Sequence, residues 1–222
     1  MLLNLEGRQI APRRVFCIGR NYRDHIAELG GEVPDDVVIF MKPDTALLPE
    51  GVPIPVPVHG DELHYEAEVV LLIGREGRVQ KADEVADFVA GVSLGLDMTL
   101  RDVQRRIFAA TRPWELCKAF DGSAPIGRFR RLENVPDLGS LRFTCTINDD
   151  VRQRGDVRDM LFPPGALLKA ISRAWKLLPG DLVFTGTPAG IGAVNPGDRI
   201  RLESDALGRF DWRVGAKVNR PD

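Results

Sequence analysis

Histidine and cysteine are scarce in this sequence, with three of each among 222 residues. The cysteines Cys17, Cys117 and Cys145 are odd in number and lie far apart along the chain. This distribution argues against a disulfide framework and against a cysteine-based zinc site, and it fits a reducing compartment. We therefore expect a cytoplasmic protein. If the chain binds a metal ion, oxygen atoms must supply most of the ligands.

A basic excess and a long apolar run are also absent. The chain carries 30 Lys and Arg against 32 Asp and Glu, whereas a nucleic-acid partner usually leaves a surplus of basic residues. No run reaches the ~18 apolar residues that span a bilayer. The first residues become charged too soon for a secretory signal peptide. The sequence therefore predicts neither a nucleic-acid partner nor a membrane partner.

Short apolar runs and alternating segments dominate the chain, and few stretches have helical spacing. This pattern predicts one mostly β domain with a few covering helices, an α+β arrangement. Residues 49–57 carry proline at alternate positions, so this stretch must be extended and can only be an edge or a connector. The expected strands are 15–18, 37–41, 64–73, 92–97, 143–147, 151–154, 182–185, 198–202 and 210–214, and the expected helices are 21–29, 99–109 and 167–178.

Two glutamates, Glu66 and Glu68, lie two residues apart in the expected strand 64–73. Residues at this spacing share one face of a strand and lie about 6–7 Å apart. Their face becomes apolar at Val70 and Leu72, which favours a strand buried on both sides. Two carboxylates there need a proton, a basic partner or a divalent cation such as Mg²⁺, Mn²⁺ or Ca²⁺. An edge strand with one wet face explains the same pattern, because glutamate is rarely buried.

Asp97 could complete such a metal site. It shares a strand face with Ser93 and Gly95, whose small size leaves room for something other than protein. It equally suits a negative charge placed just before a helix. Thr99 with Asp102 resembles a capping box that would open that helix.

Three further segments carry candidate chemistry. His25 and Glu28 project from the same edge of the expected helix 21–29, where a carboxylate can hold an imidazole as a general base, although an ordinary surface pair has the same spacing. Gly30-Gly31 ends this helix and suits the hinge of a lid.

Lys118 lies in an apolar run, either extending its amine to solvent or poised over a site. The glycine-rich segment 185–192 is either a tight turn or a cradle for a small carboxylate, with Thr187 as donor.

Seven motifs, taken in their order, resemble the fumarylacetoacetate hydrolase family. The match runs from about residue 15 to the end of the chain, and it looks most like the short, single-domain branch that contains acylpyruvate hydrolases and oxaloacetate decarboxylases. The motifs are Gly-Arg-Asn-Tyr at 19–22, His-x-x-Glu at 25–28, Met-Lys-Pro at 41–43, His-x-Glu-x-Glu at 64–68, Leu-Asp-Met-Thr-x-Arg-Asp-x-Gln at 96–104, Lys-Ala-Phe-Asp at 118–121 and Thr-Gly-Thr-Pro-x-Gly-x-Gly at 185–192.

The resemblance implies a mixed β-sandwich roll that usually forms a homodimer. It implies one catalytic domain over 1–222, with an N-terminal extension over 1–14 and a mobile lid over 20–36. It also implies bound Mg²⁺ or Mn²⁺. The residues that it assigns are the metal ligands Glu66, Glu68 and Asp97, the catalytic residues His25, Glu28 and Lys118, and the substrate contacts Arg20, Lys42, Gln104 and Thr187.

The implied activity is metal-dependent hydrolysis of a C–C bond in acylpyruvate-type 2,4-dioxo acids, through a pyruvate enolate. Oxaloacetate decarboxylation and isomerisation of unsaturated 2-oxo acids would use the same enolate, so these activities remain alternatives. A non-enzymatic carboxylate-binding protein of this family would be expected to lack part of the dyad or the lysine. Here His25, Glu28 and Lys118 are all present. Of the other histidines, His64 lies on the carboxylate side of its strand and His59 has no assigned role.

Overall fold

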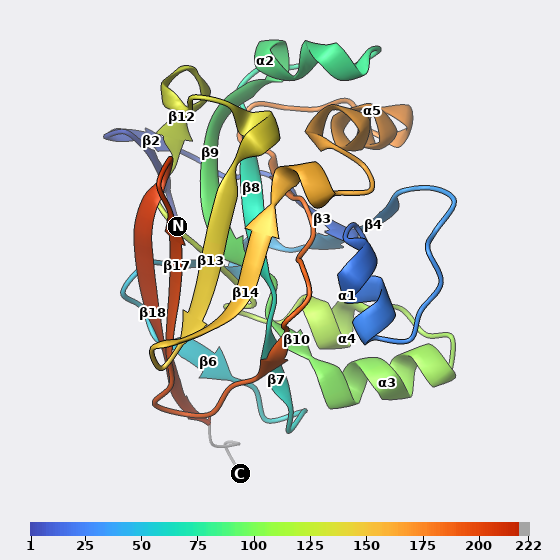
Figure 1. The fold of residues 1–222 in the computed structure, drawn as a ribbon, viewed down its shortest axis with the longest axis vertical. Coiled ribbons are helices and arrows are strands. Elements are labelled where there is room, and N and C mark those ends of the chain that lie inside the picture. Colours follow the sequence, from blue (N-terminus) through green and yellow to red (C-terminus); the bar gives the residue numbers. More distant parts are fainter. Residues whose placement is uncertain (218–222) are drawn as a thin grey trace.

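Two β-sheets pack against each other in this computed structural model, which describes residues 1–217 (Figure 1). The larger sheet has eight strands in the order β4-β3-β15-β8-β9-β11-β5, with β12 also paired to β9. The smaller sheet has the order β14-β13-β17-β18-β6. Helices α2 and α5 lie together at one end of the sheets, while α1, α3 and α4 gather along one side (Figure 1). The mostly β architecture with covering helices is therefore confirmed.

The elements are short, as the alternating patterns predict. The helices are α1 (Arg23–Glu28), α2 (Val85–Phe88), α3 (Arg101–Ala109), α4 (Glu115–Lys118) and α5 (Pro164–Ala174), with 3-10 turns η1 (Asp44–Ala46), η2 (Ala82–Glu84), η3 (Leu132–Asn134), η4 (Leu138–Ser140) and η5 (Val157–Asp159). The strands are β1 (Leu3–Leu5), β2 (Arg8–Ile10), β3 (Val15–Gly19), β4 (Val38–Lys42), β5 (Leu47–Pro49), β6 (Ile54–Val56), β7 (Leu63–Tyr65), β8 (Ala67–Ile73), β9 (Val89–Leu96), β10 (Thr99–Leu100), β11 (Ala124–Ile126), β12 (Arg130–Arg131), β13 (Arg142–Ile147), β14 (Asp150–Asp156), β15 (Leu182–Phe184), β16 (Gly192–Ala193), β17 (Arg199–Ser204) and β18 (Gly208–Lys217).

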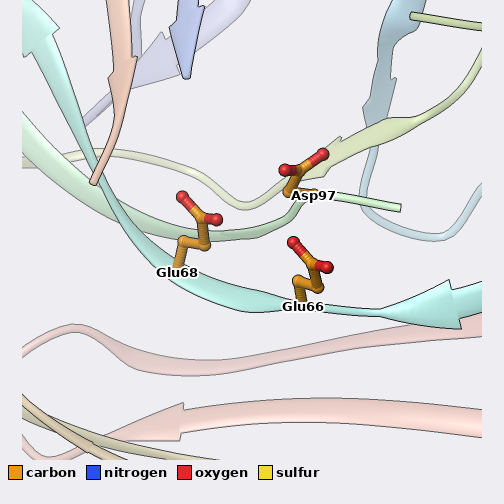
Figure 2. Close-up of side chains that lie close together, drawn as sticks. All are labelled: Glu66, Glu68 and Asp97. Carbon is orange, nitrogen blue, oxygen red and sulfur yellow. The ribbon is translucent and has the colours of Figure 1, made fainter. Parts of the chain in front are cut away.

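Strands β8 and β9 bring three acidic side chains together at one end of their antiparallel ladder. Glu66 lies in the break between β7 and β8, Glu68 lies in β8, and Asp97 directly follows β9 (Figure 2). The backbone N–H of Asp97 donates to the carbonyl of Glu66 at 2.8 Å, so the ladder continues past the end of β9. Backbone pairing therefore fixes the spacing of the three carboxylates.

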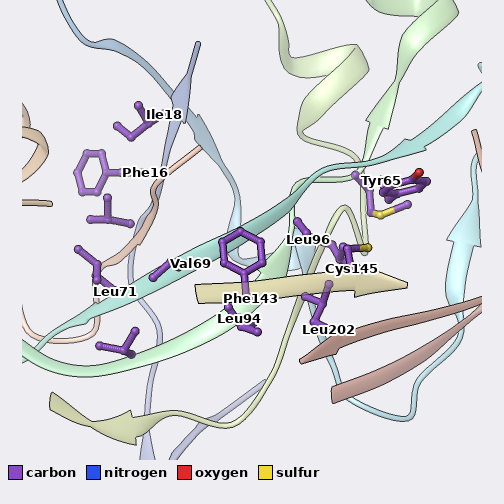
Figure 3. Packing of buried hydrophobic residues seen from close by; sticks show 14 of the residues in the cluster. Phe16, Ile18, Tyr65, Val69, Leu71, Leu94, Leu96, Phe143, Cys145 and Leu202 are labelled. Carbon is purple, nitrogen blue, oxygen red and sulfur yellow. The ribbon is translucent and has the colours of Figure 1, made fainter. Parts of the chain in front are cut away.

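The core between the two sheets is formed by alternate residues of facing strands. Val69 and Leu71 of β8 and Leu94 of β9 meet Phe143 of β13 and Leu202 of β17 (Figure 3). The other face of β8 is buried in a second cluster with the β1–β2 hairpin and β15. Every residue of β8 is buried, as the strand buried on both sides requires, and the alternative of an edge strand with a wet face is wrong.

The proline-rich stretch 49–57 is both an edge and a connector. Strand β5 ends at Pro49 on the edge of the larger sheet, and β6 lies on the edge of the smaller sheet, parallel to β18. Proline is tolerated at these positions because an edge strand does not need all its N–H donors. The segment therefore carries the chain from one sheet to the other.

Two expected helix boundaries are wrong. The second expected helix begins at Arg101 rather than Thr99, because Thr99 and Leu100 pair with β7 as strand β10. The Thr99 hydroxyl donates to the carbonyl of Asp97, and no side chain caps α3, so the expected capping box does not form. The third expected helix ends at Ala174, and Trp175 leaves it to pack against Phe16 with ring centroids 5.5 Å apart.

The room expected beside Gly95 is filled by protein. A β-carbon at Gly95 would lie 2.9 Å from the ring of Phe184 and 2.9 Å from the carbonyl of Pro125. Ser93 points inward and donates to the carbonyl of Arg128 at 3.0 Å. The small residues therefore serve close packing of the sheet, and any open volume at Asp97 must lie beyond the end of the strand.

Candidate active site

A cavity of about 460 Å³ opens over the carboxylate cluster. Helix α1 and the end of β3 form one wall, α3 and the start of α4 form another, and the glycine-rich segment closes a third. The lining residues are Ile18, Gly19, Arg20, His25, Ile26, Glu28, Leu29, Gly31, Phe40, His64, Glu66, Glu68, Asp97, Arg101, Gln104, Arg105, Phe108, Trp114, Lys118, Thr187 and Ile191. Segments far apart in the sequence thus share one pocket.

The three predicted metal ligands form a buried triad at the base of this cavity. Glu66, Glu68 and Asp97 each offer an oxygen within 4.8 Å of the others (Figure 2). Each residue is at most 4% exposed. Among residues 1–217 this is the only such group of three or more His, Cys, Asp and Glu. Three carboxylates that lie this close together and are shielded from solvent require compensating positive charge.

Basic side chains supply part of that charge. The Lys118 ammonium lies 2.7 Å from Glu66 and 2.6 Å from Asp97, and Arg101 pairs with the other oxygen of Glu66. Burial acts to raise the pKa of Glu66, but Lys118 and Arg101 outweigh it and hold that pKa well below its usual range. Burial likewise acts to lower the pKa of Lys118, and the two carboxylates raise it overall. Glu66 is thus held ionised and Lys118 protonated.

Glu68 is the carboxylate of the triad that has no direct basic partner in the described part of the chain. One oxygen accepts a hydrogen bond from the backbone N–H of Gly186 at 2.8 Å. Burial, followed by the nearby Asp97, raises the pKa of Glu68 well above its ordinary value. An uncompensated buried carboxylate beside two others fits a divalent cation, and the all-oxygen donor set suits Mg²⁺ or Mn²⁺. These three residues could therefore hold the ion.

His25 and Glu28 face the same cavity from α1. The Nδ1 atom of His25 lies 3.5 Å from the Glu28 carboxylate, and the imidazole is buried. Burial lowers the pKa of His25 below its ordinary value, so the ring is neutral near pH 7 and can accept a proton. Glu28 also accepts the N–H of Gly190, at 3.2 Å from each carboxylate oxygen. The glycine-rich segment thus orients the carboxylate that faces the imidazole.

The predicted substrate contacts fall into two pairs. Arg20 and Gln104 line the cavity, and Arg20 makes no ion pair or hydrogen bond among residues 1–217. Lys42 does not line the cavity: its ammonium is fully buried, 2.9 Å from Asp97, and donates to the carbonyls of Lys118 and Ser123.

Thr187 does line the cavity, but its hydroxyl is already committed. It donates to the carbonyl of Ala67 at 2.8 Å and accepts from Gln153 at 2.8 Å. The structure therefore places Lys42 and Thr187 as supports of the site.

The sequence assigned no role to Arg101, and it indicated the backbone of the glycine-rich segment 185–192 only as a cradle for a small carboxylate. Arg101 bridges Glu66 and Gln104, and its place four residues after Asp97 on the cavity side of α3 was the available signal. Gly186 has φ +97°, and a β-carbon there would lie 2.7 Å from Asn21, so only glycine can aim this N–H at Glu68. The carboxylates that the glycine-rich cradle holds are the protein's own.

The other two histidines, His64 and His59, lie in different surroundings. His64 lines the cavity beside Arg101, and burial lowers its pKa to about 4, so it is neutral. His59 lies outside the cavity, with Nε2 2.9 Å from the carbonyl of Leu116.

Comparison with known proteins agrees with this geometry. The family model "Fumarylacetoacetate (FAA) hydrolase C-terminal" matches residues 14–215. The chain belongs to the fumarylacetoacetate hydrolase family. It is 38% identical to the mitochondrial oxaloacetate tautomerase FAHD1 of Rattus norvegicus, over 91% of each chain. It is 36% identical to the mitochondrial oxaloacetate decarboxylase of Dictyostelium discoideum, over 85% of this chain and 87% of that one.

The solved structure of a similar enzyme shares the whole fold. The fumarylpyruvate hydrolase of Pseudomonas aeruginosa, crystallised with Mn²⁺ and pyruvate, superposes with a TM-score of 0.92 at 36% identity. The alignment covers 98% of this chain and 96% of that one. The β-sandwich roll expected from the resemblance is thus confirmed, and the chain is an enzyme of this family. Among residues 1–217 no helix is long and apolar enough to cross a membrane.

Proposed function

We propose that this enzyme is a divalent-metal-dependent hydrolase that cleaves a C–C bond in acylpyruvate-type 2,4-dioxo acids. The observation that carries the proposal is one cavity that holds a buried carboxylate triad, a protonated lysine and a neutral histidine 3.5 Å from a glutamate. Mg²⁺ or Mn²⁺ on Glu66, Glu68 and Asp97 would act as a Lewis acid toward the 2-oxo acid. Water attack and charge stabilisation then fall to the protein's own groups.

Side chains of the cavity carry out the attack by water and the stabilisation of the leaving group. His25, held by Glu28, removes a proton from water, and the hydroxide attacks the carbonyl two carbons from the 2-oxo group. As the C–C bond breaks, pyruvate leaves as an enolate. The Lys118 ammonium stabilises its negative charge at the buried base of the cavity. Arg20, the guanidinium of the cavity without an ion pair in the described chain, suits the carboxylate that every 2-oxo acid carries.

Oxaloacetate decarboxylation is the second candidate, because it needs the same enolate and no attacking water. The relative named as an oxaloacetate decarboxylase favours it, whereas the relative named as an oxaloacetate tautomerase favours isomerisation through the same enolate. Lys118 and the carboxylate triad serve both reactions, whereas His25 is required as a water base only for hydrolysis. The residue that separates the two candidates is therefore His25.

The decisive experiment measures both reactions in purified wild type and in His25→Ala, with Mg²⁺ and with EDTA. We expect His25→Ala to abolish cleavage of acetylpyruvate, to retain part of any oxaloacetate decarboxylation, and EDTA to abolish both in wild type. His59→Ala is the matched control, since His59 lies outside the cavity and should leave both rates unchanged. Equal loss of both reactions in His25→Ala would contradict its role as the water base, and full activity in EDTA would sink the metal assignment.

Three further expectations complete the proposal. As the family resemblance implies, the enzyme forms a homodimer and residues 20–36 move as a lid. The few, widely spaced cysteines favour the cytoplasm as its location. The lid is supported by α1, which carries His25 over the cavity and is followed by Gly30 at φ +64°. Light scattering of the purified chain tests the dimer. Protease protection by Mn²⁺ with pyruvate tests the lid.

A further inference from the structure

An aromatic wall lines the part of the cavity that the proposed chemistry does not use. Phe40 of β4, Phe108 of α3 and Trp114, which precedes α4, all face this cavity. The ring centroids of Phe40 and Trp114 are 5.4 Å apart, and those of Phe108 and Trp114 are 4.9 Å apart. All three rings are only half-buried. Three contacting rings from three elements, left partly open toward one cavity, form an apolar surface prepared for a ligand.

This wall is continuous with the reactive centre. The Lys118 ammonium that contacts Glu66 and Asp97 also lies 5.4 Å from the centroid of the Phe40 ring. A substrate whose enolate oxygen meets Lys118 therefore lies close enough to Phe40 for a substituent beyond its second carbonyl to reach the aromatic wall. The aromatic wall begins where the reacting atoms end.

The opposite wall of the cavity is apolar as well. Ile26 is buried in α1, while Leu29 is 46% exposed and lines the cavity from the end of the same helix. Of the two guanidinium groups nearby, Arg105 is paired with Glu62 at 2.8 Å. The Arg20 guanidinium lies 3.9 Å from the point where a β-carbon of Gly31 would be, and the substrate's own C1 carboxylate suits it. Ile26 and Leu29 thus add apolar surface to a cavity that three arginines also line.

The size of the cavity also favours a substrate with a bulky group. Cavities of about 300–1,000 Å³ bury drug-sized ligands, and this one measures about 460 Å³. A four-carbon acid such as oxaloacetate fills only a small part of it. An acid with a ring or an extended alkyl chain beyond its second carbonyl fills much more.

We propose that Phe40, Phe108 and Trp114 form a tail subsite that selects 2,4-dioxo acids whose fourth carbon carries a bulky apolar group, above all an aromatic ring. The inference rests on the proposed acylpyruvate chemistry for its catalytic readout. The tail displaces water from the three rings and stacks against them. A charged tail gains less from this subsite, because a second carboxylate would lose its hydration against the three rings.

The first test compares kcat/KM for acetylpyruvate, benzoylpyruvate, fumarylpyruvate and oxaloacetate with Mn²⁺. We expect benzoylpyruvate to exceed acetylpyruvate by about tenfold or more, the effect of burying one ring face. In Phe108→Ala the ratio of benzoylpyruvate to acetylpyruvate should fall about tenfold. Trp175→Ala is the control, since Trp175 is a partly exposed aromatic residue outside the cavity. Its ratio should match wild type.

The second test needs no turnover. It titrates the Mn²⁺-loaded enzyme with 4-phenyl-2-oxobutanoate and with 2-oxobutanoate, which share the 2-oxo acid head and lack the cleavable second carbonyl. We expect tighter binding of the phenyl compound with a change in tryptophan fluorescence, and loss of that change in Trp114→Phe.

The two tests separate the tail subsite from the reaction. If no acylpyruvate is cleaved but the phenyl preference in binding remains, the hydrolase proposal fails and the tail subsite stands. Equal binding of both probes, or preference for fumarylpyruvate over benzoylpyruvate, overturns the tail subsite whatever the reaction is.

Discussion

At the scale of single residues, burial sets the chemistry of His25. Its imidazole lies against Glu28 inside the cavity, where desolvation disfavours the charged form and lowers its pKa. A lowered pKa leaves a neutral base at neutral pH without any other partner. Burial in the triad also favours the neutral form of Glu68, and for a carboxyl group this raises the pKa.

We expect the rate of acylpyruvate hydrolysis to rise with pH through the pKa of His25 and then to level off. Because burial lowers that pKa, the acid limb should have its midpoint below 6.5, the ordinary value for histidine. Glu28 acts to raise the pKa of His25, so Glu28→Gln should move the midpoint to still lower pH as well as slow the reaction. Profiles of kcat/KM for both proteins test this, and a midpoint above 6.5 in wild type would contradict it.

Lys42 shows that a motif can mark a residue as part of a site without revealing its contacts in the fold. Its motif marked it as a substrate contact, yet its ammonium is buried against Asp97, Ser123 and the Lys118 carbonyl. Lys42→Met would leave Asp97 without this cation and two carbonyls without a donor. Removing one member of such a buried pair costs about 3–5 kcal/mol, so we expect Lys42→Met to lower the free energy of unfolding by that amount.

Urea denaturation measures the effect, and Arg20→Gln provides the control. Arg20 has no ion pair among residues 1–217 and is exposed, so its replacement should change the free energy of unfolding by less than about 0.5 kcal/mol. If Lys42→Met were as stable as Arg20→Gln, the supporting role of Lys42 would be wrong.

At the scale of elements, strands were easier to predict than helix ends. The alternation of 64–73 predicted both faces of β8, because a strand buried on both sides constrains every side chain. Thr99 was expected to cap a helix, but its backbone pairs with His64 of β7 instead. Helix α4 has only one turn, too short to show a helical period, so its existence depends on tertiary contacts that no sequence pattern reports.

Gly165 fixes how closely α5 approaches η2. A β-carbon at Gly165 would lie 1.8 Å from the carbonyl oxygen of Ala82, so Gly165→Ala must push the two elements apart. Overpacking of this kind costs about 1–3 kcal/mol, and we expect the melting temperature to fall accordingly. Lys169→Ala, at an exposed position of the same helix, is the control and should melt as wild type does. An unchanged melting temperature for Gly165→Ala would show that α5 packs more loosely.

At the scale of the whole molecule, the sequence predicted which residues meet but not how their charges balance. The family motifs identified Glu66, Glu68 and Asp97 as one site, and the structure brings them together. The pairing of Lys118 and Arg101 with Glu66 depends on how α3 and α4 dock beside β8, which no motif encodes. Packing thus leaves Glu68 as the carboxylate without a cation in the described chain, and it links metal binding to global stability.

This link predicts opposite effects of one substitution with and without metal. Mn²⁺ at 100 times its dissociation constant should stabilise the wild type by about 2.7 kcal/mol, which raises the melting temperature by about 5–10 °C for a domain of this size. Glu68→Gln keeps an oxygen for the Gly186 N–H and removes a carboxyl group that is costly to ionise beside Asp97. We therefore expect this variant to melt at or above the wild type in EDTA and to gain little or nothing from Mn²⁺.

Differential scanning calorimetry in EDTA and in Mn²⁺ measures both effects, with Glu203→Gln as the control. Glu203 is an exposed acid of β17, so its variant should follow the wild type in both conditions. A Glu68→Gln protein that is less stable than wild type in EDTA would mean that this carboxylate is already compensated without an ion. A full Mn²⁺ shift in Glu68→Gln would place the ion elsewhere. The scan in EDTA therefore reports the electrostatic cost of Glu68, and the scan in Mn²⁺ reports its role as a ligand.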